Sequence, residues 1–153
     1  MCLSRRVIDE LDVVLKAVPL LKSDPAEFDA MRAYMGTTAC VVDCTFPVAE
    51  GEAGLRRHIE RIRREAEEGV RSGCAHVILT DEAQCAERAV IPMILSVGAV
   101  QTHLVKNGLR TFTSLNVRVA ESLEVHYVAV LIGAGATTVN AYLAQESIAD
   151  RHR

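Results

Sequence analysis

The segment Gly73-Cys74-Ala75-His76-Val77-Ile78-Leu79-Thr80-Asp81 decides the fold of this chain. It follows a long helical pattern, and a glycine at that point supplies the left-handed conformation that ends many helices. The apolar run Val77–Leu79 is short and stops at polar residues, which is typical of a buried strand. A helix, a glycine and a buried strand together form the unit of a βα repeat, in which helices join parallel strands.

The same order of helix, glycine and strand occurs twice more along the sequence. Asn107-Gly108 leads into a run that ends at Asn116, and Gly133-Ala134-Gly135 leads into a run that ends at Asn140. The predicted strands are Cys40–Asp43, Val77–Thr80, Thr111–Asn116 and Thr137–Asn140. We therefore predict an α/β fold, a parallel βα repeat of about four units that makes half of a TIM-barrel-like architecture.

Helical patterns fill the spaces between these strands and precede the first one. The predicted helices cover roughly residues 52–72, 91–106, 122–132 and 141–148. Upstream, Arg6–Val18 has apolar residues at a helical period, and Asp24-Pro25 can begin a second helix that ends at Gly36. The predicted organisation is a helical lead-in over residues 1–36 and a partial α/β domain over residues 37–153.

Composition excludes several classes of function. A net charge of −3 over 153 residues argues against a nucleic-acid surface. Arginines between Arg56 and Arg64 alternate with glutamates at i,i+4 spacing, which is typical of a solvated helix face. No apolar run reaches the roughly 18 residues of a membrane span. The five cysteines follow no zinc or disulfide pattern and no leader is visible, so we expect a cytoplasmic protein with free thiols.

Polar residues gather where the predicted strands end. The carboxyl ends of parallel strands share one rim, which is where ligands bind in such folds. The candidate rim residues are Asp43, Thr45, Thr80, Asp81, Asn116, Arg118, Glu121 and Asn140. The same side chains can instead cap the helices that follow each strand, and the sequence leaves both interpretations open.

Other candidate motifs point to no chemistry. Gly133-Ala134-Gly135 precedes a strand, whereas a dinucleotide-binding loop follows a strand and opens a helix. Cys2 could become an N-terminal nucleophile, but the helical pattern after it lacks the glycine-rich strand that such a site needs. His103 and His126 are expected to be partly buried structural residues. We assign no catalytic, cofactor-binding or metal-ligating residue.

An ordered series of short motifs resembles the central domain of the glutamate synthase large subunit. The series begins at Asp43-Cys44-Thr45-Phe46-Pro47-Val48 and ends at Val139-Asn140-Ala141-Tyr142-Leu143-Ala144. Between them lie Gly51–Leu55, Val77–Asp81, Ile91-Pro92-Met93, Gly98-Ala99-Val100, His103-Leu104-Val105, Gly108-Leu109-Arg110-Thr111, Val125-His126-Tyr127 and Ile132–Ala136. The resemblance covers about residues 39–148.

The resemblance implies a specific role. Enzymes of this family release ammonia from glutamine in an amidotransferase domain and pass it through an internal tunnel to an FMN barrel. There it reacts with 2-oxoglutarate and a reductant to give glutamate. The resemblance places FMN and an iron–sulfur cluster in the parent enzyme but neither in the central domain, which links the two sites and contributes to the tunnel wall. The implied partners are the amidotransferase and FMN-barrel portions, with self-association as the other expectation.

Several positions depart from the family pattern. No amidotransferase motif follows Cys2, and the cysteines lack the cluster spacing. Gln101-Thr102 and Ala141 stand where the family often has a histidine pair and a proline. We expect a divergent member, a split gene product or an excised fragment that is not catalytic alone. The alternatives are a free-standing α/β protein that binds a small ligand at the rim, or a self-associating remnant without activity.

Overall fold

The computed structural model describes residues 30, 33 and 36–151. The helix predicted over Arg6–Val18 and the candidate Cys2 therefore lie outside the described residues. The same holds for nearly all of the helix predicted after Asp24, which leads up to the predicted boundary near residue 36. The division into a lead-in and an α/β domain stays a prediction.

Four parallel strands form the main sheet. They are β1 (Ala39–Asp43), β3 (His76–Thr80), β5 (Ser114–Arg118) and β6 (Thr138–Asn140), and their order in space is β1-β3-β5-β6. The helices α3 (Gly51–Arg71), α4 (Met93–Lys106) and α5 (Val125–Gly133) connect them, and α6 (Tyr142–Arg151) follows β6. The strand order never reverses, unlike that of a doubly wound sheet. The predicted α/β class and the parallel sheet of four strands are confirmed.

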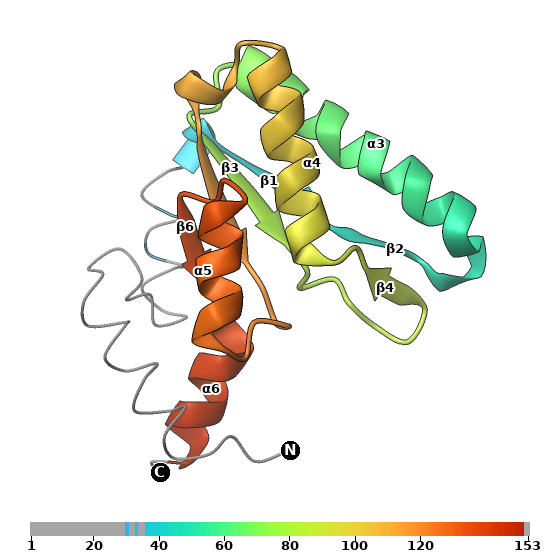
Figure 1. Cartoon of the computed structure of the whole chain (residues 1–153), viewed down its shortest axis with the longest axis vertical. Helices are drawn as coiled ribbons and strands as arrows, with labels where there is room; N and C mark the ends of the chain where they lie inside the picture. The colour runs from blue at the N-terminus through green and yellow to red at the C-terminus, as the bar shows by residue number, and fades with distance from the viewer. Residues whose placement is uncertain (1–29, 31–32, 34–35, 152–153) are drawn as a thin grey trace.

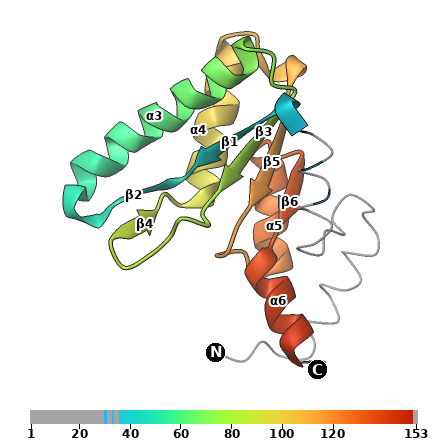
Figure 2. The ribbon, with the colours of Figure 1, turned by 180° about the vertical axis from the view of Figure 1, so that it is seen from behind.

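The connecting helices cover one face of the sheet, and the hydrophobic core lies between them and the strands. Val42, Val77, Leu115 and Val139 point from the four strands into this core, because alternate residues of a strand face opposite sides. Figure 1 shows α3, α4 and α5 in front of the strands, and Figure 2 shows the strands from behind. The arrangement matches one segment of a barrel wall, with helices outside and a second face inside.

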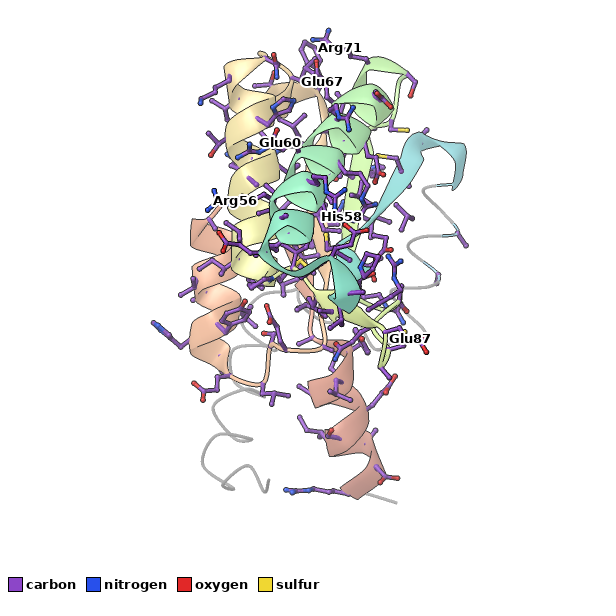
Figure 3. The ribbon with its side chains drawn as sticks, turned by 90° about the vertical axis from the view of Figure 1, so that its right-hand side faces the viewer. Arg56, His58, Glu60, Glu67, Arg71 and Glu87 are labelled. Atoms are coloured by element: carbon purple, nitrogen blue, oxygen red, sulfur yellow. The ribbon has the colours of Figure 1, made fainter. Side chains whose placement is uncertain are left out.

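The longest helix, α3, follows directly from its sequence. Its buried residues Ile62, Ala66 and Val70 are four positions apart and form one apolar stripe against the sheet. The helix ends where Gly73 adopts a φ of +101°, a conformation that favours glycine. Beside the stripe, charged side chains such as Arg56, Glu67 and Arg71 follow the length of the helix on its side toward α4 (Figure 3).

The charged face of α3 is solvated, as the sequence indicates, although its ion pairs are partly different. Arg61 pairs with Glu65 at 3.1 Å, as the spacing predicts. Arg56 instead pairs with Glu52 at 2.9 Å, and Arg71 pairs with Glu67 at 2.8 Å. In the part of the chain that the structure describes, no helix is long and apolar enough to cross a membrane.

Two elements differ from the sequence prediction. The strand predicted over Thr111–Asn116 lies at Ser114–Arg118, because Arg110–Phe112 forms a 3₁₀ turn, η4, before it. The segment after β1, for which no strand was predicted, forms β2 (Thr45–Pro47). This strand pairs antiparallel with β4 (Arg88–Val90), and the two make a short ribbon beside the main sheet. Two further 3₁₀ turns, η2 (Gly36–Thr38) and η3 (Val48–Glu50), flank β1 and β2.

Candidate functional site

Four of the predicted rim residues form one row across the carboxyl ends of the strands. Asp43 of β1 is in register with Thr80 of β3, Thr80 with Arg118 of β5, and Arg118 with Asn140 of β6. Residues in register on parallel strands project to the same side, and this side is the one opposite the core. These four side chains therefore share one edge and one face of the sheet, and their role as a ligand-binding rim or tunnel lining stays a prediction.

The first end of the row is held by a pair of arginines. The Asp43 carboxylate accepts hydrogen bonds from the Thr45 backbone N–H at 2.9 Å and from its hydroxyl at 2.8 Å. Arg88 of β4 contacts the other Asp43 oxygen at 2.6 Å and donates to the Thr45 hydroxyl at 2.8 Å. Arg61 of α3 donates to the backbone carbonyls of Asp43 and Thr45 at 2.7 and 3.1 Å. Asp43 and Thr45 therefore join the sheet to the β2–β4 ribbon and to α3.

The middle of the row carries a partly buried charge cluster. Arg118 is buried, and its Nε lies 3.0 Å from a carboxylate oxygen of Glu82. The Arg118 guanidinium also lies over the Tyr142 ring, 5.4 Å from its centroid, a cation–π arrangement. The Thr80 hydroxyl donates to Glu82 at 3.1 Å and accepts from the Glu82 backbone N–H at 3.2 Å. These contacts hold the positive charge of Arg118 at the rim.

Asp81 directly follows Thr80, beyond the end of β3, and lies next to the row. Its side chain is fully buried, and Oδ2 accepts a hydrogen bond from the Ala120 backbone N–H at 2.8 Å. Burial raises the pKa of Asp81, and the bond from Ala120 opposes that rise. Tyr142 lies beside it, where burial and then the charge of Asp81 raise the pKa of Tyr142 to about 12. The tyrosine hydroxyl therefore stays protonated next to the carboxylate.

Glu121 serves as a helix cap rather than as a member of the row. Its carboxylate accepts a hydrogen bond at 2.7 Å from the backbone N–H of Met93, the first residue of α4. The Tyr127 hydroxyl donates to the same carboxylate oxygen. Burial and this bond raise the pKa of Tyr127 to about 12. A carboxylate at the amino end of a helix offsets the unpaired N–H groups and the helix dipole there.

Asn116 was predicted at the end of a strand, and this placement is wrong. The residue lies in the middle of β5, one row away from the rim, because β5 begins and ends later than the prediction. Its side chain donates to Ser114 Oγ at 2.9 Å and accepts from the Thr138 hydroxyl at 2.8 Å. His76 continues the network with a ring nitrogen 2.7 Å from Ser114 Oγ. The polar face of the sheet thus has an internal hydrogen-bond network across β3, β5 and β6.

The other end of the row is Asn140, which is buried and donates to Gln145 of α6 at 3.0 Å. Sequence reasoning missed Arg61, Glu82, Arg88 and Tyr142, whose side chains complete the rim. Tyr142 follows the strand end at Asn140 by two positions, so the strand-end rule could have included it. Arg61 and Arg88 reach the rim from a helix and from an unpredicted ribbon, and no local signal marks them.

The described cysteines are poor candidates for cluster or metal ligands. In residues 36–151, no three His, Cys, Asp or Glu side chains gather in a way that could hold a metal ion. The part of the chain that the structure describes therefore does not fit an iron–sulfur cluster.

Comparison with known proteins gives the chain a family. The family described as "Glutamate synthase central domain" matches residues 6–153. The glutamate synthase [NADPH] large chain of Azospirillum brasilense is 66% identical over 128 residues, which cover 84% of this chain and 8% of the relative. The chloroplastic ferredoxin-dependent glutamate synthase of Spinacia oleracea is 40% identical over 133 residues, 84% of this chain and 7% of the relative.

A third relative carries NADH in its name. The glutamate synthase [NADH] of Schizosaccharomyces pombe is 36% identical over 126 residues, which cover 80% of this chain and 6% of the relative. The chain thus spans less than a tenth of the length of each of these three relatives. The match over residues 6–153 includes the strands, the rim and the connecting helices, and on this basis the chain belongs to the glutamate synthase central domain family.

Proposed function

We propose that this chain is the segment of a glutamate synthase that links the amidotransferase site to the FMN site and forms part of the ammonia tunnel wall. The parent reaction converts glutamine, 2-oxoglutarate and a reductant into two molecules of glutamate. Family membership and 66% identity to the Azospirillum brasilense large chain support the assignment to this class of enzyme. The matched relatives carry NADPH, ferredoxin and NADH in their names, so we propose a role that does not depend on the electron donor.

The polar face of the sheet is the observation that carries the tunnel proposal. In a barrel-like wall, the face opposite the helices is the inner one, and here it carries the row from Asp43 to Asn140 together with the network around Asn116. A face with fixed hydrogen-bonding groups suits the passage of a small polar molecule such as ammonia.

The same contacts support a role without catalysis. Asp43 is engaged by Arg88, Thr80 by Glu82, and Glu121 by the amino end of α4. Side chains committed to such structural bonds hold the rim in place instead of moving protons. We assign FMN and the iron–sulfur cluster to other portions of the parent enzyme, in line with the resemblance.

Exposed apolar side chains suggest where the other portions of the enzyme pack. Phe112 of η4 is 71% exposed and Val105 of α4 is 55% exposed. Large apolar groups in contact with water are commonly covered in an assembly. We propose that the amidotransferase and FMN-barrel portions cover them, and that the isolated chain self-associates through them. The four described cysteines are free thiols, which fits a cytoplasmic location.

The tunnel proposal can be tested in a chimera in which this chain replaces the matching segment of the Azospirillum brasilense enzyme. Val41 lies on the inner face of β1, two positions before Asp43, and is 45% exposed. We expect Val41→Phe to lower the glutamine-dependent formation of glutamate from 2-oxoglutarate while ammonia-dependent formation and glutamine hydrolysis continue. Val48→Phe in η3, at a similar exposure of 52%, is the matched control and should change none of the three rates.

Equal effects of the two substitutions would refute the tunnel role of this face. A loss of glutamine hydrolysis in Val41→Phe would also refute it, because an obstructed passage leaves the amidotransferase chemistry intact. The proposal is supported only if glutamine-dependent glutamate formation falls while glutamine hydrolysis continues.

A further inference from the structure

Two half-buried cysteines lie together where α3, β1 and β3 meet. Cys40 is the second residue of β1, and its sulfur packs against α3 so closely that a Cβ added to Gly69 would lie 2.5 Å from it. Cys74 lies just beyond the end of α3, and its backbone N–H donates to the Gly69 carbonyl at 3.0 Å. Both residues are therefore anchored to the same glycine of the last helical turns.

The two thiols are also electrostatically coupled. The pKa of Cys40 is raised to about 11, first by burial and then by the neighbouring Cys74 thiol. A thiol that influences another in this way lies at short range. Both residues lie at the same end of the sheet, since Ala39 pairs with His76 and Cys74 precedes β3 by two residues. No function discussed above uses either residue.

We propose that Cys40 and Cys74 are a reversible disulfide site that ties the start of β1 to the connection between α3 and β3. With hydrogen peroxide as oxidant, one thiolate attacks an oxygen atom, the O–O bond breaks and a sulfenic acid forms. The hydroxide that leaves takes up a proton and becomes the first water. The second thiolate then attacks that sulfur, the S–S bond forms and the second water leaves. In total the two thiols lose two protons and two electrons, and the peroxide is reduced to two waters. A small dithiol reverses the step by exchange.

Cys40 and Cys74 differ from the other described cysteines in their exposure to solvent. Cys44 is fully buried in the hydrophobic core, and Cys85 is exposed in the loop before β4. Peroxide reaches the exposed Cys85 first. We propose no disulfide partner for Cys85, so its oxidation should end at the sulfenic acid or a higher acid. Since the thiolate is the reacting form, disulfide formation should accelerate as the pH rises toward about 11, the pKa of Cys40.

The test is thiol mapping of the full chain after mild peroxide treatment. Free thiols are alkylated, the protein is digested without reductant, and peptides are identified by mass spectrometry. We expect a cross-linked peptide pair that contains Cys40 and Cys74, lighter by two hydrogen atoms than the separate peptides and lost on dithiothreitol treatment. A disulfide over this span should also raise the Tm by about 5 °C or more. Cys85→Ser should leave the cross-link unchanged.

Three experimental results would overturn the proposed disulfide. Complete alkylation of Cys40 and Cys74 in peroxide-treated protein that remains folded would overturn it, and so would a cross-link that joins two different molecules. Because Cys40→Ser could disturb the core, Gly69→Ala is the second variant. Its added methyl displaces the Cys40 sulfur, and we expect cross-linking to slow at least several-fold. An unchanged rate in folded Gly69→Ala would contradict the proposed geometry.

Discussion

Arg88 and Asp43 lie 45 positions apart in the sequence, and their side chains meet at 2.6 Å. Arg88 belongs to the β2–β4 ribbon and Asp43 to the end of β1, so the contact fastens the ribbon to the rim of the main sheet. The Thr45 hydroxyl, which Arg88 also contacts at 2.8 Å, completes this junction. The rim is therefore held by tertiary contacts as well as by the strand pairing.

Removal of the Arg88 side chain should destabilise the protein. We expect Arg88→Ala to lower the free energy of unfolding by about 1–3 kcal/mol, since the carboxylate of Asp43 and the buried Thr45 lose their donor. Urea unfolding followed by circular dichroism measures the loss. Arg56→Ala is the control, because Arg56 makes an exposed pair with Glu52, and such pairs contribute less than about 0.5 kcal/mol. Equal losses in the two variants would mean that the Arg88 junction is no stronger than a surface pair.

Most of the sheet could be predicted from the sequence because its signals are local. A glycine after a helix and a short apolar run mark β3 without knowledge of the rest of the chain. The same signals misplaced β5, since Thr111 and Phe112 have strand propensity but lie in η4. There Arg110 donates to the Thr113 and Gly135 carbonyls, at 2.5 and 2.9 Å, which fixes the turn. Such long-range contacts leave no local pattern.

The candidate site was predictable to the extent that it depends on topology. The row from Asp43 to Asn140 follows from the alignment of parallel strand ends, and sequence reasoning found it. Asn116 was misplaced together with its strand. The β2–β4 ribbon was missed because each strand has only three residues, and the partner that stabilises it lies far along the chain. Its arginine could not be assigned to the rim for the same reason.

The cap on α4 gives a second prediction. Glu121→Ala should lower the free energy of unfolding by about 1 kcal/mol, because the Met93 N–H loses its acceptor and the helix dipole loses a compensating charge. Denaturant unfolding with Glu124→Ala as the control provides the comparison. Glu124 precedes α5 and makes no side-chain cap bond. A larger loss in the control than in Glu121→Ala would contradict the assignment of the cap.

The buried carboxylate of Asp81 gives a prediction about pH. Its pKa in the folded protein is raised above the ordinary value of 3.8, so the folded state holds the proton more tightly than the unfolded state. Ionisation therefore costs stability as the pH rises through the folded pKa. Asp81→Asn keeps an acceptor for the Ala120 N–H and removes this cost. We expect the variant to have the higher Tm at neutral pH, and the difference to shrink as the pH falls.

Glu67→Gln is the control with the opposite sign. Bonds from Arg71 and then His103 lower the pKa of Glu67, so its contribution to stability is present above the unfolded pKa and is lost as the pH falls through the folded one. This variant should be the less stable at neutral pH and approach the parent in acid. Thermal melts between about pH 3 and about pH 8 measure both differences. The same sign for the two variants would show that the two carboxylates are not perturbed in opposite directions.

Self-association of the isolated chain can be tested through its most exposed aromatic residue. We expect sedimentation velocity at micromolar concentration to show a dimer or larger species. Phe112→Ser should shift it toward the monomer, because the phenyl ring is 71% exposed and gains most from being covered. Thr111→Ser, next to it and also exposed, is the matched control. A parent chain that sediments as a single monomer would contradict the prediction.

The most direct measurement of the central claim is the number of glutamates formed per glutamine consumed by the Azospirillum brasilense chimera that carries this chain in place of its own matching segment. At 66% identity over the aligned region, we expect the chimera to form two glutamates for each glutamine, as the parent reaction requires. The isolated chain, measured alongside, should form none. A folded chimera that forms only one glutamate per glutamine, which is the yield of glutamine hydrolysis alone, would contradict the claim that this chain is a linking segment of a glutamate synthase. An isolated chain that forms glutamate would contradict it as well.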